Sequence, residues 1–358
     1  MIEKDTKTVS LKERMTKLRS ATDYKLPLKS YVIVCIDGHS FSKLIKNKYK
    51  KPFDDKFINM MNEVGKYVCK KVEGCKFAYT QSDEITFVLT DFETENTCAY
   101  FGNRLTKILS IIPAMATAKF NQMVFADLCD TPCSNADLKQ MIMDAKLADF
   151  DCKAFSVDNL NDVYAYILWR QIDCIRNSKQ QTAQAWLSHK TLERLDTDEQ
   201  IKLLLDEKGI DWNTFDDGKK YGRFIYKVVE HYHNDDLNTD YDRSVWKAFD
   251  AFPIMAENNK KKFIDMHIIP DINYCRTKEA IPKDLEEEIR ILTADDDIAI
   301  TKSTNFYNDL AFDSLDLVEL TIALEKKYNI KFIPEDGTIV LNTVQDLINE
   351  LEKRGVRF

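Results

Sequence analysis

Two short apolar stretches, each carrying an acidic residue, constrain what this chain can fold into. Residues 32–41 read VIVCIDGHSF, and residues 77–89 read FAYTQSDEITFVL. Each stretch has the length and apolar content of one buried strand. A carboxylate inside a buried strand costs free energy unless a cation compensates its charge. We therefore expect Asp37 and Asp83 to lie on neighbouring strands and to share a divalent cation, and their hard oxygen ligands favour magnesium.

The order of these stretches predicts an α+β fold. The strand that ends at Asp37 is followed by a helical pattern over residues 52–71, and then by a hairpin that bears Asp83. This is the order of a ferredoxin-like βαββαβ sheet, the palm of polymerases and nucleotide cyclases. In such a palm, two carboxylates hold two metal ions. Strand-end aspartates also often only cap a turn or pair with a lysine, and the residues alone leave that alternative open.

Length and charge indicate two domains. A chain of 358 residues is long for one domain. Residues 285–358 contain 16 acidic and 8 basic residues, and 43 residues of each kind precede them, so the net charge of −8 belongs entirely to the tail. We expect a catalytic region over residues 1–275, a linker over residues 276–284 and a second domain over residues 285–358.

Cysteine usage and hydropathy indicate a cytoplasmic protein. The nine cysteines are scattered and contain no Cys-x-x-Cys pair, which argues against a disulfide framework and a zinc site. We expect no apolar run near the roughly 20 residues that span a bilayer. The N-terminal residues MIEKDTK are too polar for a signal peptide. The chain is thus expected to have no membrane partner.

Five motifs in a fixed order resemble the tRNA-histidine guanylyltransferase family, over roughly residues 10 to 230. The resemblance is closer to the relatives that repair tRNA 5′ ends. The motifs are Ile36-Asp37-Gly38-x-x-Phe41, Lys51-Pro52-x-Asp54-Asp55, Ala78-Tyr79-x-Gln81-Ser82-Asp83-Glu84, Arg104-x-x-Lys107-x-x-Ser110 and Trp169-Arg170-Gln171-x-Asp173.

The resemblance implies a nucleotidyltransferase that adds nucleotides, with GTP favoured, to the 5′ end of tRNA or a tRNA-like RNA. Growth in the 3′-to-5′ direction, activation of the RNA by ATP and a dimeric or tetrameric assembly are also implied. Two magnesium ions would be held by Asp37, the Gly38 carbonyl and Asp83. Asp37 and Asp83 would be the catalytic residues, and Glu84 would support them.

The same resemblance implies binding roles for further residues. Arg170 and Asn177 would contact RNA. Arg104, Lys107 and Ser110 are spaced three apart, so they are predicted to share one face of a helix over residues 96–120, where an ordinary solvated stripe is the alternative. The residues expected to bind nucleotides or triphosphates are His39, Ser40, Phe41, Lys51, Ser82, Arg104, Lys107 and Ser110.

Two departures from the histidine-tRNA enzymes leave other functions open. Cys35 stands where the family usually has an arginine, and residues 175–181 keep Asn177 but lack the histidine and tyrosine of the family pattern. Both departures fit the repair-type relatives. They also favour a degenerate nucleotide-binding module that serves a carrier-protein pathway. A nucleotide cyclase or signalling-nucleotide synthase stays open as well, because similar sheets carry out that chemistry.

The tail resembles an acyl or peptidyl carrier protein, a small all-α four-helix bundle. Asp313-Ser314-Leu315 would begin its second helix. The resemblance implies that Ser314 carries 4′-phosphopantetheine, which a phosphopantetheinyl transferase would attach and an acyl-loading enzyme would use. A helix N-terminus also favours an incoming phosphate through its amides and its dipole.

The predicted second helix of the tail has an acidic side and an apolar side. Asp316, Glu319 and Glu325 could attract basic partner enzymes. Helical spacing predicts a core formed by Leu315, Val318, Ile322 and Leu347. An unmodified bundle that serves only as a docking or solubility module is the alternative.

Overall fold

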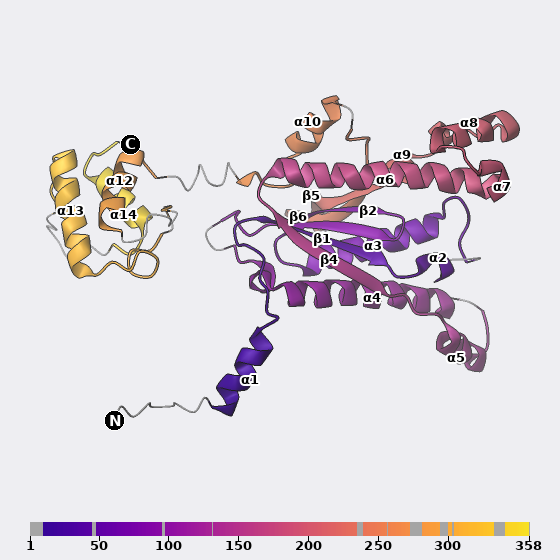
Figure 1. Cartoon of the computed structure of the whole chain (residues 1–358), viewed down its shortest axis with the longest axis horizontal. Coiled ribbons are helices and arrows are strands. Elements are labelled where there is room, and N and C mark those ends of the chain that lie inside the picture. The colour runs from indigo at the N-terminus through magenta and orange to yellow at the C-terminus, as the bar shows by residue number, and fades with distance from the viewer. Residues whose placement is uncertain are drawn as a thin grey trace, which may run out of the picture. The chain divides into compact units, whose positions relative to one another are not determined.

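The chain folds into two compact units, Met1–Ile272 and Asn273–Phe358 (Figure 1). The predicted linker lies mostly outside the described residues, and a helix begins within it, at Lys283. The computed structural model describes residues 10–44, 48–94, 97–130, 132–234, 239–255, 257–272, 281–293, 300–302, 304–332 and 341–357.

A six-stranded sheet forms the centre of the first unit. Its strand order is β4-β1-β3-β2-β5-β6, and every neighbouring pair is antiparallel. The first four strands are connected as strand, helix, strand, strand, helix, strand, which confirms a mixed helix and antiparallel-sheet fold. The strands are β1 (Tyr31–Gly38), β2 (Cys75–Gln81), β3 (Glu84–Leu89), β4 (Phe150–Val157), β5 (Arg223–Asn234) and β6 (Thr239–Asp250).

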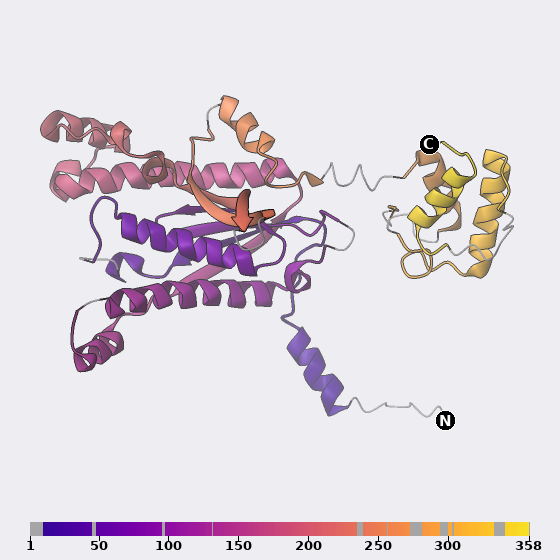
Figure 2. The ribbon, with the colours of Figure 1, turned by 180° about the vertical axis from the view of Figure 1, so that it is seen from behind.

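Two helices, α3 (Asp55–Lys71) and α4 (Leu105–Cys129), cover one face of this sheet. Figure 2 shows them on the same side. Asp54 begins α3 by accepting a hydrogen bond from the Phe57 amide. The helical pattern predicted over residues 52–71 is confirmed, and the apolar side chains of α3 lie in the core. They include Phe57, Met60, Met61, Val64 and Val68.

The long helix α4 has the length and apolar composition of a membrane-spanning helix. This differs from the expectation that no such segment exists, because α4 contains few charged residues. A core helix of a soluble protein meets the same criteria, and α4 buries Ile108, Ile112, Ala116 and Phe120 in the core that it shares with α3 and the sheet. The packing therefore accounts for part of its apolar composition, since 33% of its most apolar window is buried.

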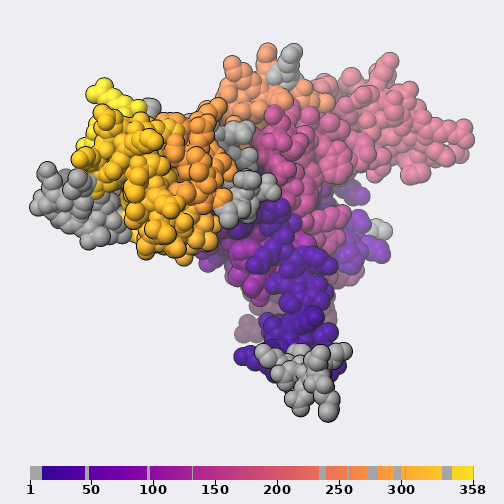
Figure 3. Space-filling view, turned by 60° about the vertical axis from the view of Figure 1, so that its left-hand side comes forward, coloured from indigo at the N-terminus to yellow at the C-terminus, as the bar shows by residue number. Residues whose placement is uncertain are grey.

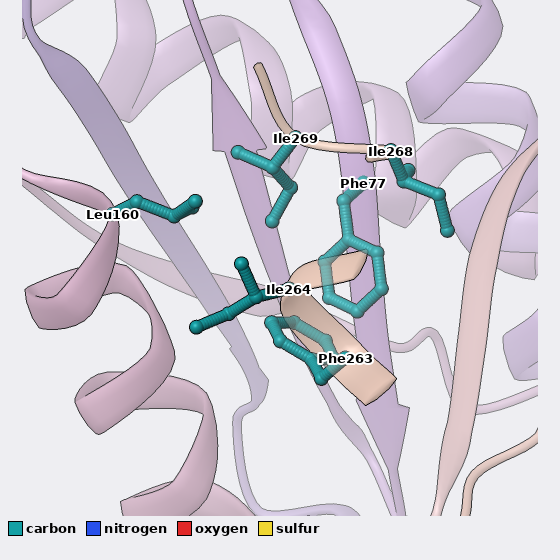
Figure 4. A pocket seen from close by; sticks show the side chains of 6 residues that line it. All are labelled: Phe77, Leu160, Phe263, Ile264, Ile268 and Ile269. Carbon is teal, nitrogen blue, oxygen red and sulfur yellow. The ribbon is translucent and has the colours of Figure 1, made fainter. Parts of the chain in front are cut away.

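The opposite face of the sheet is covered by α6 (Leu160–Trp186) and by α10 (Glu257–Asp265). Figure 4 shows how closely α10 packs there, with Phe263 and Ile264 beside Phe77 of β2. The space left between them is about 10 Å³, which is no more than one water needs. It is a packing defect and is too small for a ligand.

Shorter elements complete the first unit. Helix α1 (Leu11–Ser20) buries none of its residues, and Figure 3 shows it standing away from the body of this unit. The others are α2 (Phe41–Leu44), η1 (Tyr100–Asn103), α5 (Asn135–Asp144), α7 (His189–Leu192), α8 (Thr197–Lys208), η2 (Trp212–Thr214) and α9 (Asp217–Tyr221).

The second unit contains α12 (Lys283–Leu292), α13 (Ser314–Tyr328) and α14 (Val344–Lys353). The described residues thus include three helices of the four that the sequence predicts. Thr343 and Asp346 form a capping box that begins α14. Leu347 lies in the core, as predicted.

The predicted core positions of α13 are wrong. Leu315, Val318 and Ile322 are 64%, 50% and 58% exposed, and Leu317, Leu320 and Leu324 are buried instead. Both sets have the i, i+3, i+7 spacing of one helical face. Spacing alone could not decide between them, because only the contacts with α12 and α14 determine which face turns inward.

A fully buried glutamine connects α6 to the chain on either side of the β5–β6 hairpin. Gln171 Nε2 donates to the carbonyls of Tyr221 and Phe252, at 3.2 and 3.0 Å, and its Oε1 accepts from the amide of Ile254 at 2.7 Å. Every partner is a backbone group, and the Tyr221 carbonyl also accepts from the Tyr79 hydroxyl at 2.8 Å. The glutamine of the Trp-Arg-Gln motif is therefore structural.

We predict that Gln171→Leu lowers the free energy of unfolding of the first unit by about 2–4 kcal/mol, because it leaves buried backbone groups unpaired. All four tryptophans lie in this unit, so urea denaturation followed by tryptophan fluorescence reports on it alone. The exposed Gln180 on the same helix provides the control, and Gln180→Leu should change stability by less than about 0.5 kcal/mol. Equal stabilities of the two variants would contradict the structural role.

Candidate functional site

Acidic side chains gather where β1 and β2 end and β3 begins. The β1–β3 register places Asp37 directly opposite Glu84. Asp83 lies in the two-residue turn between β2 and β3, so the prediction that it lies within a strand is wrong. The amide of Gly38 donates to the carbonyl of Asp83 at 3.2 Å, which fixes this turn to the end of β1. The structure therefore brings the two predicted catalytic residues together.

These carboxylates are destabilised in their charged form. Burial raises the pKa of Asp37, and the negative charges of Asp83 and Asp151 raise it further. Burial also raises the pKa of Asp83, against the hydrogen bond that Ser82 Oγ donates to its Oδ1 at 2.9 Å. Within the part of the chain that the structure describes, no lysine or arginine forms an ion pair with either aspartate. A bound cation would relieve this repulsion.

The donor set suits magnesium only if the substrate supplies ligands. Among the described residues, no group of three His, Cys, Asp or Glu side chains is arranged to hold a metal ion. Asp37, Asp83 and the carbonyl of Gly38 would supply oxygens and leave the remaining positions to water and phosphate. Magnesium commonly binds in this way, through one or two carboxylates. The residues present therefore fit the predicted metal.

Gly38 is required here by close packing. A Cβ atom at this position would lie 2.4 Å from the ring of Phe41. That ring is buried among Phe57, Phe120 and Phe150, with centroid distances of 6.3, 5.2 and 5.0 Å. The side chain of Phe41 is thus part of the core, and only its backbone could contact a nucleotide.

The two residues before Phe41 remain exposed at the end of β1. The His39 side chain is 4.0 Å from the Asp149 carboxylate, and its Nε2 is 3.5 Å from Ser40 Oγ. The amide of His39 donates to the carbonyl of Asp149 at 2.9 Å. Of the three residues predicted to bind nucleotide in this segment, His39 and Ser40 therefore present side chains to solvent.

Arg170 has an internal role that differs from the RNA contact implied by the resemblance. Its Nε donates to Glu84 Oε1 and its Nη2 to Asp173 Oδ2, both at 2.8 Å, and its guanidinium lies 4.3 Å from the ring centre of Trp169. The side chains of Arg170 and Glu84 are 11% and 14% exposed. Because these donors are occupied and buried, Arg170 holds Glu84 in place beneath the aspartates.

Cys35 contributes no charge to this network. Burial, together with the nearby Glu84 carboxylate, raises the pKa of the Cys35 thiol to about 12. The thiol is therefore neutral, where the family usually has an arginine. Arg170 is consequently the cation that pairs with Glu84.

A cavity of about 330 Å³ opens beside the β2–β3 turn, between the start of α3, the C-terminal half of α6, and α9. Its volume is in the range of small-molecule sites. Three predicted residues line it, namely Lys51, Ser82 and Asn177. Sequence reasoning did not assign its other walls, although Gln81 lies in a quoted motif. They include Tyr49, Phe53, Phe57, Gln81, Gln181 and Arg223.

Arg104 and Lys107 lie elsewhere. They line a second cavity, of about 350 Å³, together with Arg19 of α1. The cavity lies near the start of α4, where the Leu26 amide donates to the Asn103 carbonyl at 2.9 Å. The aspartates lie near the middle of α4, where the amide of Phe150 in β4 donates to Thr117 Oγ1 at 3.2 Å. With a rise of about 1.5 Å per residue, the two places are roughly 18 Å apart along α4.

The predicted shared face of Arg104, Lys107 and Ser110 is only partly correct. Arg104 precedes α4 as its N-cap residue, and its Nε is 3.6 Å from Asp23 Oδ2. Ser110 Oγ donates to the carbonyl of Lys107 at 3.3 Å. Within one chain, the structure does not bring these residues to Asp37 and Asp83.

In the second unit, Ser314 is exposed at the first position of α13. Asp313 caps this helix, and its Oδ1 accepts from the amides of Leu315 and Asp316 at 2.7 and 3.1 Å. These amides are therefore already bonded, so the prediction that the helix amides receive a phosphate is not supported. The hydroxyl of Ser314 itself remains accessible.

Each of the two units matches a known protein family. Residues 12–158 match the family model described as tRNAHis guanylyltransferase, and residues 284–351 match the model of a phosphopantetheine attachment site. The tRNA(His) guanylyltransferase 1 of Arabidopsis thaliana is 29% identical over 214 residues, which are 56% of this chain and 34% of that protein. The Neurospora crassa tRNA(His) guanylyltransferase is 25% identical over 212 residues, which are 56% of this chain and 68% of that protein.

Solved structures agree with these matches. A bacterial tRNA(His) guanylyltransferase-like protein in complex with ATP is 31% identical, with a TM-score of 0.60, over 73% of this chain and 99% of that chain. A complex of such a protein with GTP is 28% identical, with a TM-score of 0.54, over 72% of this chain and 98% of that chain. The chain spans only about a third of the Arabidopsis protein.

We predict that Arg170→Met lowers the free energy of unfolding of the first unit by about 3–5 kcal/mol, because it leaves the Glu84 carboxylate buried without its partner. Adding Glu84→Gln to this variant should restore at least half of the loss, as measured by urea denaturation. An RNA-contact role predicts instead a stable Arg170→Met variant that has lost only RNA affinity, and that result would contradict the internal role.

Proposed function

The chain belongs to the tRNA(His) guanylyltransferase family, and we propose that its first unit is a nucleotidyltransferase acting on the 5′ end of tRNA or a tRNA-like RNA. We further propose that it adds nucleotides in the 3′-to-5′ direction, with GTP favoured. The observation that carries this proposal is the placement of Asp37 and Asp83 at one end of the sheet, beside a cavity of about 330 Å³. A bound nucleotide would fill the cavity, and the cation that accompanies it would neutralise the two aspartates.

In this proposal each residue of the site has a defined task. Asp37, Asp83 and the Gly38 carbonyl would hold two magnesium ions, which would lower the pKa of the attacking 3′-hydroxyl of the incoming nucleotide and neutralise the AMP that leaves the activated 5′ phosphate. Ser82 orients Asp83 through its hydrogen bond. Lys51, at the cavity, positions the phosphates and stabilises their developing charge.

The cavity has the character of a base-binding site. Aromatic and aliphatic side chains form part of its wall, and Gln81 and Asn177 add hydrogen-bonding groups. We assign to Asn177 a contact with the bound nucleotide. We also propose that ATP activates the RNA by transferring its adenylyl group to the 5′ phosphate, which releases pyrophosphate and prepares that phosphate for attack.

The second cavity suits RNA. Arg19, Arg104 and Lys107 outnumber the one carboxylate there, that of Asp23, and give the cavity a net positive charge. The hydroxyls of Thr16, Ser20, Thr22 and Thr106 also line it. Cations of this kind bind the phosphate backbone without regard to sequence. Because this cavity is far from Asp37 within one chain, we propose a dimer or tetramer in which one RNA spans two subunits.

The second unit is proposed to act as a carrier in the cytoplasm. A phosphopantetheinyl transferase would transfer 4′-phosphopantetheine from coenzyme A to the exposed hydroxyl of Ser314, and would release adenosine 3′,5′-bisphosphate. The exposed side chains of Leu315, Val318 and Ile322 lie on the same helix and would offer an apolar contact to that enzyme. An acyl-loading enzyme would then use the thiol of the arm.

We expect Asp83→Asn to abolish nucleotide transfer without loss of fold, because the amide keeps the shape of the side chain and removes its charge. The measurement uses purified protein, magnesium, ATP, labelled GTP and a 5′-truncated tRNA transcript. Asp206→Asn, on the exposed surface of α8, is the matched control and should retain full activity. Wild-type rates in Asp83→Asn would contradict the proposal, and label in a small soluble product would indicate a cyclase or synthase.

We expect the intact mass of the protein to increase by one phosphopantetheine group after incubation with coenzyme A and a phosphopantetheinyl transferase. Ser314→Ala should remove this increase, because it removes the hydroxyl that accepts the group. Thr321→Ala, on the same helix, should be modified like the wild type. An unmodified wild-type protein would favour a docking module that carries no arm.

A further inference from the structure

An exposed tryptophan lies beside the candidate site. Trp169, on the outer face of α6, is 57% exposed, and Ile172, one turn further along the helix, is 47% exposed. Exposure alone means little, because single apolar side chains are common on protein surfaces. What distinguishes Trp169 is how its ring is held and where it lies.

The neighbours of Trp169 fix the orientation of its ring. The guanidinium of Arg170 lies 4.3 Å from the ring centre, and Arg170 is itself hydrogen-bonded to Glu84 at 2.8 Å. A cation over the face of a tryptophan is attracted to it. The ring centres of Trp169 and Tyr166 are 5.6 Å apart, and those of Tyr166 and Phe155, in β4, are 5.1 Å apart. A ring ordered in this way loses little further entropy when a flat ligand stacks on it.

The same ring is close to the two aspartates. Arg170 contacts both the Trp169 ring and the carboxylate of Glu84, so one guanidinium separates them. Glu84 in turn lies directly opposite Asp37, and the Cα atoms of paired residues in antiparallel strands are about 5 Å apart. A base stacked on Trp169 would therefore hold its own 5′ phosphate near Asp37 and Asp83.

The Trp169 ring and the cavity of about 330 Å³ lie on opposite sides of the aspartates. The ring contacts Tyr166, which packs on β4, whereas the cavity wall includes Gln81 of β2 and Arg223 of β5. In the sheet order β4-β1-β3-β2-β5, the strand β1 that carries Asp37 lies between them. Two substrates bound at these places would meet at the aspartates, as the joining of two nucleotides requires.

We propose that Trp169 is the stacking platform for the 5′-terminal base of the RNA, whose outer face is free at the end of the acceptor stem. An aromatic side chain can stack on any base, because every base has a π-face. Lys153 is exposed on the same strand as Phe155 and on the same face of it, and offers a cation to the adjacent phosphates. The inference rests on the proposed function, in which the 5′ end of an RNA lies at the aspartates.

The exposed patch is too small to be the centre of a stable protein interface. The exposed large apolar side chains of α6 are Trp169, Ile172 and, at its last residue, Trp186. A stable interface buries about 800 Å² on each partner. Beside Trp169 and Ile172 the surface is charged, because Asp173 and Arg176 form an ion pair there. A single base therefore fits this patch better than a protein surface does.

Photocrosslinking of the wild-type protein tests this contact directly. The probe is a 5′-truncated tRNA with a 5′ monophosphate and with 5-bromouridine as its 5′-terminal nucleotide, bound in the presence of magnesium. Irradiation joins C5 of a stacked bromouracil to the aromatic ring and releases hydrogen bromide. We expect mass spectrometry to find the adduct on Trp169, and to find none when 5-bromouridine is placed inside the acceptor stem. An adduct confined to other residues, or no adduct from the terminal position, would overturn the proposal.

A series of variants then measures what the stacking contributes. Trp169→Ala should raise the Kd for the RNA by about 5- to 100-fold, which corresponds to the loss of one base–aromatic stack, and should leave the Kd for ATP unchanged. Trp169→Phe keeps a flat ring and should stay within about threefold of the wild type. Trp186→Ala, at the other end of the exposed face of α6, is the matched control and should bind RNA like the wild type. Equal RNA affinities of Trp169→Ala and Trp186→Ala would refute the inference.

These measurements separate the inference from the proposed function. An adduct on Trp169 in a protein that transfers no nucleotide would retain the stacking role and overturn the transferase proposal. Nucleotide transfer without an adduct on Trp169 would do the opposite. If there is no adduct and Trp169→Ala changes the sedimentation of the protein, the patch contacts a second copy of the chain and the inference is wrong. If Trp169→Ala does not fold, the wild-type adduct and the RNA affinity of Trp169→Phe still decide between these outcomes.

Discussion

The antiparallel pairing of β1 with β3 determines where every group of the candidate site lies. Its register sets Asp37 opposite Glu84, and the Gly38 amide binds the β2–β3 turn through the Asp83 carbonyl. A slip of one residue would send Asp37 to the other face of the sheet, away from α6 and Arg170. The packing of β1 opposes such a slip, because Val32, Val34 and Ile36 face the core formed with α3 and α4, while Tyr31 and Ile33 are fully buried on the opposite face.

The sequence was sufficient for the elements whose signals are local. The two strands, the helix α3 and the meeting of Asp37 with Asp83 follow from continuous apolar runs, helical spacing and the order of the motifs. Gly38 and Ser82 were likewise found in the segments where the structure needs them. These features depend on neighbours in the chain, so the pattern of residue types carries the information.

Features that depend on distant partners could not be predicted in this way. Arg170 and Glu84 are 86 residues apart, and nothing in either segment shows that they pair. The same limit explains the incorrect core of α13, where two helical faces have the same apolar spacing. It also explains why Arg104 lies far from the aspartates, since its position depends on the direction of α4 across the sheet. Arg223 was overlooked because its cavity is formed by segments from α3, α6 and α9.

The division of the chain into two units has a kinetic consequence. The second unit is part of the same polypeptide as the first, so the two are present in equal number whatever the expression level. Because the units are covalently linked, their encounter is intramolecular instead of bimolecular. Dilution does not change the effective concentration of one unit around the other, which reaches the millimolar range for short flexible linkers. The rate of any reaction that requires both units of one chain would therefore be first order in protein concentration.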